Sequence, residues 1–264
     1  ELSVKYPDYN FVPVFWMASE DHDFEEIASV NIFGEKFEWK TNQTGAVGRF
    51  IIDDFLVDIL DKVETKIQSQ PFGSDVLNLL KSSYVKGRNL SDATRYFVSK
   101  LIASSNLIII DGDDAELKKQ FREIANREVS ENVSFEKVTT ADKELNKFNY
   151  HSQVHSRSIN LFQLKEQSRR RITSQDISNL KDEEISPNAL LRPIYQELIL
   201  PNVAYIGGAG EISYWMQLKP SFDEFKVNFP ALVVRNSIVI STPKISRYLN
   251  KLNLSFPDIF KSTD

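Results

Sequence analysis

Four short apolar runs are the feature that most constrains the fold of this chain. Residues 11–18 (FVPVFWMA), 106–111, 203–206 and 231–235 have the length of β-strands, and segments with the apolar spacing of helices separate them. Strands that are apolar on both faces need cover on both sides, as in parallel sheets packed between helices. The sequence therefore predicts an α/β fold in which these four strands share one mostly parallel, Rossmann-like sheet.

Two stretches are predicted to lie outside this sheet as insertions, residues 35–95 and 145–186. The first contains three segments with helical apolar spacing. The second contains INLFQLKEQSRRRITS, which is typical of a hairpin with its turn near Glu166 to Ser168. The whole of residues 1–264 is thus interpreted as a partial Rossmann-like core carrying two insertions.

Local signals predict where several elements begin. Ser91 is placed as the N-cap of a helix over residues 91–103, and Thr242 as the N-cap of a last helix with Pro243 in its first turn. VSFEKV, residues 133–138, is rich in β-branched and aromatic residues and is predicted to be a short strand.

Composition excludes several kinds of partner and several kinds of site. The chain has 264 residues, a formal net charge of -5 and no cysteine. An acidic balance without a basic cluster argues against nucleic acid as a partner, and the lack of cysteine excludes disulfides, thiolate metal sites and a cysteine nucleophile. No run approaches the roughly 18 apolar residues that cross a bilayer, and no signal peptide is evident, so a cytoplasmic protein without membrane contact is expected. The start at Glu1 suggests a piece of a longer protein.

Charged residues follow the first apolar strand. Glu20, Asp21, His22 and Asp23 follow residues 11–18 after the single residue Ser19. In parallel sheets ligands bind beyond the carboxyl ends of the strands, and a histidine with a pKa near 6.5 can exchange a proton at neutral pH. These residues are therefore candidates for an active site. A solvated turn in which Asp23 caps a short helix is the alternative.

The Gly-rich end of the third strand is the second candidate. YIGGAGEISYW places Gly207, Gly208 and Gly210 between a strand and a helix, where glycines allow positive φ and close approach of a ligand to the backbone. Glu211 at the helix start would repel a phosphate and favour an amine. A tight turn with an acidic first residue would explain the same pattern.

Three weaker patterns are open to two interpretations. DGDD, residues 111–114, is ordinary turn chemistry, although a divalent cation between it and EDHD would fit a transferase. Arg169 to Arg171 form either a solvated strand or a carboxylate site. His151 and His155 lack the glutamate of an HExxH motif, so no metal site is predicted.

Several segments together resemble a known family. PVFWMASEDHDFEEI, GAVGR, LIIIDGDDAELKK, NLFQLKEQSRRRI, LLRPIYQELILPNVAYIGGAGEISYWMQLKP and PALVVR are similar, in this order, to the central part of the bacillithiol biosynthesis cysteine-adding enzymes. The resemblance covers nearly the whole chain. It implies a Rossmann-type core like that of nucleotidyltransferases and class I aminoacyl-tRNA synthetases, interrupted by connecting-peptide insertions.

The resemblance also implies a reaction, which is the joining of L-cysteine to glucosaminyl malate by a ligase that forms an amide bond. ATP or another nucleotide would activate the cysteine carboxylate by analogy with the synthetases. Family members are about twice as long, with an upstream segment carrying a GPL-T-HK-like motif and a downstream coiled coil that pairs two subunits. Neither is present here, so the full-length protein is expected to be a homodimer, and this fragment a monomer that is inactive alone.

With the family in view, roles are assigned to individual residues. The predicted catalytic residues are His22, Asp21 and Glu20, with His22 as proton acceptor or substrate orienter. The predicted substrate-binding residues are Asp23, Arg49, Arg192, Gln196, Tyr205, Gly207, Gly208, Gly210 and Glu211. Among these, Arg49 or Arg192 could clamp the malate carboxylates. Two alternatives stay open: a non-catalytic module that binds a nucleotide or sugar acid, and a metal-dependent nucleotidyl or glycosyl transferase.

Overall fold

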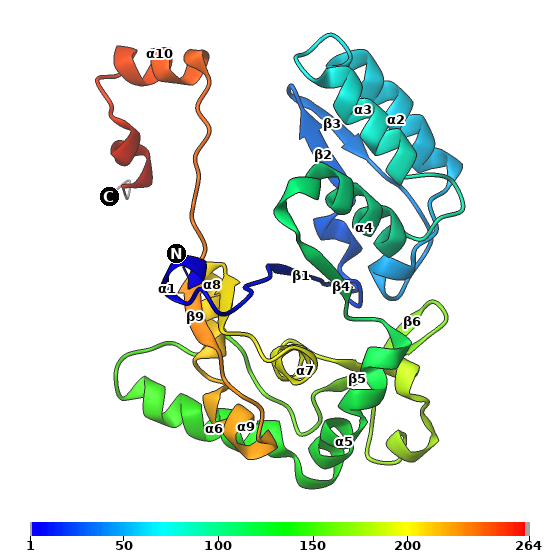
Figure 1. Cartoon of the computed structure of the whole chain (residues 1–264), viewed down its shortest axis with the longest axis vertical. Coiled ribbons are helices and arrows are strands. Elements are labelled where there is room, and N and C mark those ends of the chain that lie inside the picture. Colours follow the sequence, from blue (N-terminus) through cyan, green and yellow to red (C-terminus); the bar gives the residue numbers. More distant parts are fainter. Residues whose placement is uncertain (1, 262–264) are drawn as a thin grey trace.

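The computed structural model describes residues 2–261, and the four predicted strands form two separate parallel pairs (Figure 1). β1 (Val14–Met17) pairs with β4 (Ile108–Asp111), and β8 (Ala204–Gly207) pairs with β9 (Ala231–Val234). The prediction of parallel strands is confirmed, but the prediction of a single sheet is wrong within the described residues. The reason is that backbone hydrogen bonds join the strands only inside each pair.

Residues 29–101 form a lobe with its own small core. The antiparallel hairpin β2 (Ser29–Ile32) and β3 (Glu35–Glu38) packs with three helices, which are α2 (Asp54–Ile67), α3 (Gly73–Ser83) and α4 (Leu90–Leu101). Aromatic and aliphatic side chains fill the space between them: Phe37, Trp39, Val47, Phe50, Ile59 and Val63. The predicted cap of α4 is wrong, because Asn89 accepts the hydrogen bond from the Asp92 amide while Ser91 lies in the first turn.

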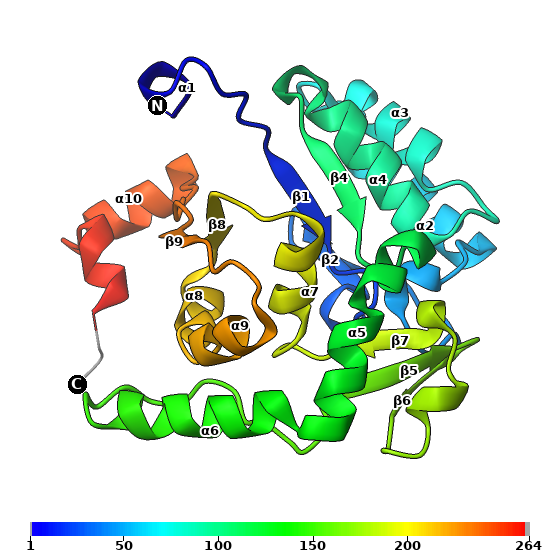
Figure 2. The same cartoon turned by 60° about the horizontal axis from the view of Figure 1, so that its bottom comes forward.

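The larger core packs against both parallel pairs, through Trp16 of β1, Tyr205 of β8 and Leu232 of β9. It packs the helices α5 (Ala115–Glu131), α6 (Val133–Asn146), α7 (Arg192–Ile199), α8 (Ala209–Trp215) and α9 (Lys219–Phe225) with the antiparallel sheet β6 (Ser168–Arg171), β5 (Leu161–Lys165) and β7 (Ile185–Pro187). Trp215, Tyr195 and Phe222 are its largest aromatic side chains without exposed surface. Figure 2 shows α7 between the two parallel pairs, so this helix can contribute to whatever lies between them.

One predicted strand is a helix instead. VSFEKV begins α6, in which Val133, Val138 and Ala141 are buried. Val138 and Ala141, three residues apart, lie on one helical face, and this burial outweighs the β-propensity of valine and phenylalanine. Propensity alone therefore misled the prediction.

The chain ends in a helix set apart from the rest. α10 (Pro243–Lys251) follows an extended segment and lies away from the main body in Figure 1, while the short α1 (Leu2–Lys5) lies at the other terminus. The predicted cap is confirmed, since the Thr242 hydroxyl accepts from the Ile245 amide at 3.3 Å. Every helix within residues 2–261 is too short or too polar to span a bilayer.

Candidate functional site

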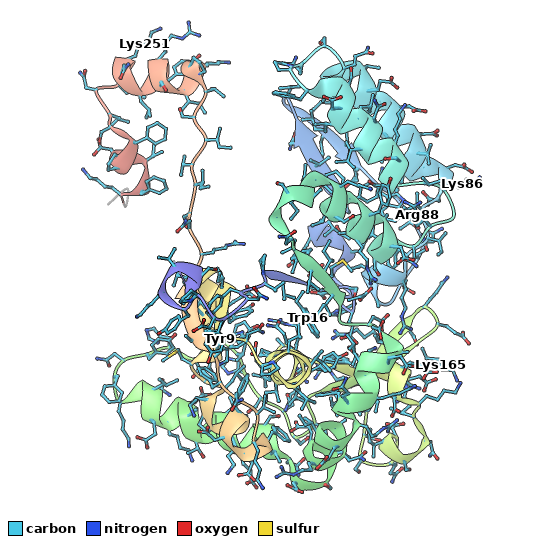
Figure 3. The ribbon with its side chains drawn as sticks, in the orientation of Figure 1. Tyr9, Trp16, Lys86, Arg88, Lys165 and Lys251 are labelled. Carbon is cyan, nitrogen blue, oxygen red and sulfur yellow. The ribbon has the colours of Figure 1, made fainter. Side chains whose placement is uncertain are left out.

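A cavity of about 1360 Å³ separates the two parallel pairs. Residues of β1 line one side and residues of β8 the other, and α7 and the β5–β6 hairpin contribute further side chains. The carboxyl ends of β1 and β8 both open on this space, so His22 and Glu211 line the same cavity. Figure 3 shows Trp16 of β1 pointing toward α7, where its ring meets Tyr195 edge-on at 5.3 Å.

The predicted site residues divide into two groups. Those that line the cavity are Glu20, Asp21, His22, Arg192, Gln196, Tyr205 and Glu211. Those that are not among the lining residues are Asp23, Arg49, Gly207, Gly208 and Gly210. The cavity therefore unites the ends of two strands that lie far apart in the sequence, as expected for ligand sites of open α/β sheets.

Glu211 is the centre of one polar cluster. Its Oε1 accepts a hydrogen bond from the Tyr205 hydroxyl at 2.9 Å and lies 3.3 Å from Arg192 Nη2. Arg192 also donates to the Tyr214 hydroxyl at 2.8 Å and to Gln196 Oε1 at 3.1 Å. Burial raises the pKa of Tyr205 to about 12, so its hydroxyl stays protonated and can donate. Because the Glu211 side chain is 45% exposed, it can also accept from a ligand.

Glu197 holds this cluster in place from behind. It is buried on α7, and its carboxylate accepts from the Asn202 amide at 2.9 Å, from the Asn202 side chain at 2.8 Å and from Gln196 Nε2 at 3.2 Å. Burial raises the pKa of Glu197. Its contacts fix both the turn that leads into β8 and the orientation of Gln196. The sequence did not point to Glu197, because no local signal distinguishes it from other polar residues in a helix.

His22 and Arg169 form a second cluster. Arg169 Nη1 lies 3.1 Å from His22 Nδ1, and its guanidinium stacks 3.9 Å from the centre of the Phe162 ring. Asp21 Oδ1 accepts from the His22 backbone amide at 2.6 Å and lies 3.3 Å from Nδ1. Since arginine has no acceptor, the contact with Arg169 requires Nδ1 to accept and places the proton of a neutral His22 on Nε2.

Arg169 is a cation without a counter-charge. Within residues 2–261 no carboxylate lies within ion-pair distance of it, and its Nε is buried without a hydrogen-bond partner. Burial lowers the pKa of Arg169. A half-buried guanidinium that keeps an unpaired buried donor beside a cavity is suited to an anionic ligand.

The acidic strand ends are tied into a buried ion network. Lys118, whose side chain has 0% exposure, lies 2.8 Å from Glu20 Oε1 and 2.5 Å from Asp113 Oδ1. Arg49 Nε and Nη2 hold Asp113 from the other side at 2.5 and 2.8 Å. Asp111 accepts from the Ser19 hydroxyl. Arg49, predicted to bind substrate, is therefore engaged by Asp113.

Opposite pKa shifts mark this network. Burial raises the pKa of Glu20 despite the nearby ammonium of Lys118. Burial also works against the charge of Asp113, but hydrogen bonds from Arg49 and the charge of Lys118 hold its pKa below the usual value. The sequence signal for Lys118 was absent, because it sits in an ordinary amphipathic helix next to Lys119.

Two predicted turn features are wrong. Asp23 precedes a short 3-10 helix, but its side chain makes no capping hydrogen bond. Its backbone amide donates to Asp21 Oδ1 at 3.3 Å. Gly207 and Gly208 have no positive φ. Gly207 serves another purpose, since a Cβ there would approach Tyr205 Cε1 to 2.7 Å. The glycine leaves room for the ring that positions Glu211.

Arginines dominate the charged lining of the cavity. Five line it, namely Arg157, Arg169, Arg171, Arg192 and Arg235, against the carboxylates Glu20, Asp21 and Glu211. Only Arg192 among the five has a carboxylate within ion-pair distance in the part of the chain that the structure describes. Across residues 2–261 no group of three or more His, Asp or Glu side chains is arranged to hold a metal ion. A cationic pocket in an acidic chain indicates an anionic ligand.

These features define a Rossmann-like α/β domain with a charged site at the carboxyl ends of its parallel strands. Comparison with known families agrees, since residues 1–236 match the model described as "Bacillithiol biosynthesis BshC, N-terminal Rossmann-like domain". The chain belongs to this family.

Curated relatives support the same assignment. A protein of Flavobacterium johnsoniae is 42% identical over 98% of this chain, one of Christiangramia forsetii is 38% identical over 98%, and one of Salinibacter ruber is 30% identical over 94%. Each is named "Putative cysteine ligase BshC". The match covers 52%, 52% and 50% of these relatives, so the chain spans about half of their length.

Proposed function

We propose that this chain forms the substrate-binding core of a cysteine ligase of bacillithiol biosynthesis, which joins the carboxyl group of L-cysteine to the amine of glucosaminyl malate. The names of the relatives support a ligase that acts on cysteine. The observation that carries the proposal is the cavity itself, which is lined by a partly exposed glutamate and by four arginines that have no ion-pair partner within residues 2–261. A substrate that carries both an anionic group and an amine could bind the arginines through the first and the glutamate through the second.

The arginines are assigned to the anionic part of the substrate. Guanidinium groups bind carboxylates in a bidentate way, and Arg169 keeps buried donor capacity that its protein neighbours leave unused. Stacking on Phe162 fixes the plane of this guanidinium. We therefore assign Arg169 and Arg171 to the malate carboxylates, in place of Arg49, which Asp113 engages.

Glu211 is assigned to the amine. The reaction forms a bond between the amine nitrogen and the carboxyl carbon of cysteine, while that carbon loses an oxygen with its leaving group and the nitrogen loses a proton. Glu211 can orient the amine and accept this proton, because Tyr205 and Arg192 occupy only Oε1 among the described contacts. Its exposed surface faces the cavity.

His22 is assigned to orientation. With Nδ1 facing Arg169, the free ring nitrogen is Nε2–H, which donates a hydrogen bond to a substrate oxygen. Action as a proton acceptor would require Arg169 to leave Nδ1. The assignment therefore makes His22 a donor and Glu211 the proton acceptor.

A nucleotide, if bound, would supply the leaving group that activates the cysteine carboxylate. Its phosphates match the chemistry of the arginine lining, with Arg157 and Arg235 as cations that the malate assignment leaves free. The family resemblance also predicts a downstream coiled coil in the full-length protein, and we propose that this coiled coil pairs two subunits.

The test uses the full-length protein with cysteine, glucosaminyl malate and ATP, and mass spectrometry detects the coupled thiol. Glu211→Gln should lower kcat by about 100-fold or more, the usual contribution of a positioned proton acceptor. Arg169→Met should mainly raise KM for glucosaminyl malate. Glu144→Gln, an exposed position on α6 outside the cavity, is the matched control and should keep wild-type rates.

Two results would contradict the proposal. Wild-type turnover in Glu211→Gln would remove that residue from the site. Tight binding of glucosaminyl malate by the full-length protein without any coupled product would favour the non-catalytic binding module.

A further inference from the structure

The facing edges of β1 and β8 carry backbone groups without partners. In a parallel pair, alternate residues of a strand bond to the same neighbour. The Ile108 amide donates to the Pro13 carbonyl at 3.0 Å, so in this register Val14 and Trp16 turn their N–H and C=O away from β4.

The same reasoning applies to β8. The Ala231 amide donates to the Val203 carbonyl at 3.2 Å and the Arg235 amide to the Gly207 carbonyl at 2.9 Å. Ala204 and Ile206 therefore turn their N–H and C=O away from β9. Within residues 2–261 none of these outward-facing groups on β1 or β8 has a backbone partner.

Both free edges open on one space. Val14, Trp16, Ala204 and Ile206 all line the cavity between the pairs. Its volume of about 1360 Å³ exceeds the roughly 300–1,000 Å³ usual for small-molecule pockets, so a substrate need not fill it. Ile206 is 67% exposed, although it is a large aliphatic residue in a strand. These are the properties of an incomplete sheet.

We propose that a fifth, parallel strand occupies the space between β1 and β8 and joins the two pairs into one sheet of order β4-β1-new strand-β8-β9. The chain spans about half the length of its relatives, so further polypeptide exists in such proteins to supply it. The strand binds through main-chain hydrogen bonds to both edges and presents apolar side chains to the exposed aliphatic residues.

The topology assigns the position of this strand in the sequence. Rossmann sheets have the strand order 3-2-1-4-5, with the first strand in the centre. If β1, β4, β8 and β9 are the second, third, fourth and fifth strands, the central place belongs to the first. The occupant is therefore a segment that precedes β1 in the longer proteins of the family.

The same arrangement explains why the predicted single sheet is divided here. Two-stranded sheets are marginal on their own, and open strand edges invite pairing. A central strand would fill the apolar part of the cavity and leave the charged part, where His22 and Glu211 lie, for a ligand. The inference concerns backbone pairing and does not depend on the proposed reaction.

Amide hydrogen exchange tests the inference on the full-length protein and on two shortened chains. One begins at Glu1 and keeps everything downstream, and the other ends at Asp264 and keeps everything upstream. The amides of Trp16 and Ile206 should exchange at least about 100-fold more slowly in the full-length protein and in the upstream-containing chain than in the chain that begins at Glu1. Amides of β5, paired on both sides, serve as the internal reference.

A proline pair adds an independent measurement. Ile206→Pro removes an N–H that faces the cavity, so it should lower the unfolding midpoint of the full-length protein and leave that of the chain beginning at Glu1 nearly unchanged. Val233→Pro removes an N–H that faces β8 in this register and should lower both midpoints.

Specific results would overturn the inference. Fast exchange of Trp16 or Ile206 in the full-length protein would refute it, whatever the shortened chains do. Protection that depends on the downstream part would refute the assigned position. Protection that appears only at raised protein concentration, or only with glucosaminyl malate, would identify a second copy or the substrate as the occupant.

Discussion

Lys118→Met is expected to destabilise the protein strongly. The ammonium group has no exposed surface and neutralises Glu20 and Asp113 at 2.8 and 2.5 Å. After the substitution Asp113 keeps Arg49, whereas Glu20 is left as a buried carboxylate without an ion-pair partner within residues 2–261. Removing one member of a buried ion pair costs about 3–5 kcal/mol, and we expect a loss in this range in the free energy of unfolding at pH 8.

The loss should depend on pH in a defined direction. A carboxyl group whose pKa is higher in the folded than in the unfolded protein binds more protons when folded, so its contribution to stability falls as pH rises from the unfolded pKa through the folded one. Burial raises the pKa of Glu20, and Lys118 opposes that rise. Without Lys118 the pKa of Glu20 rises further. The destabilisation should therefore be smaller at pH 6 than at pH 8, because protonation of Glu20 becomes easier as the pH falls.

Urea unfolding followed by tryptophan fluorescence at the two pH values provides the assay. Lys119→Met is the matched control, because the Lys119 side chain is 54% exposed and its one ion pair within residues 2–261 is with the exposed Glu116. This substitution should leave the midpoint nearly unchanged. The double variant Lys118→Met/Glu20→Gln should recover much of the lost stability, since no unpaired charge remains. A loss below about 1 kcal/mol, or one that is the same at both pH values, would refute the electrostatic reasoning.

Two further substitutions test how neighbouring parts are held. Arg49→Lys replaces a bidentate contact with Asp113 by a single point charge and should cost about 1–2 kcal/mol in urea unfolding, whereas an unchanged midpoint would mean that the fork geometry is unimportant. Gly207→Ala places a Cβ 2.7 Å from Tyr205 Cε1 and should cost about 1–3 kcal/mol in thermal unfolding, while Gly210→Ala, which meets no atom within 4 Å, should be tolerated. Equal effects of the two alanines would argue against the packing role of Gly207.

Half of the candidate site could be predicted from sequence. Glu211 and His22 were found because each follows an apolar run, and strand ends are where α/β proteins bind ligands. Tyr205 and Arg192, which contact Glu211, were also predicted as site residues. The contact between His22 and Arg169 could not be found in this way. Arg169 reaches His22 across 147 positions of the chain, a separation at which no local pattern carries information.

Local sequence determined most elements of this protein. Apolar runs of four to eight residues specify β1, β4, β8 and β9, and Thr242 and Pro243 specify the start of α10, because these signals act through neighbouring backbone groups. Only tertiary structure decided that VSFEKV is helical, since burial against other helices outweighs propensity there. It alone decided that Lys118 is enclosed by Glu20 and Asp113 while Lys119 remains in solvent. Strand pairing was decided at the same level, because the hydrogen bonds of a parallel sheet join segments whose meeting no local pattern encodes.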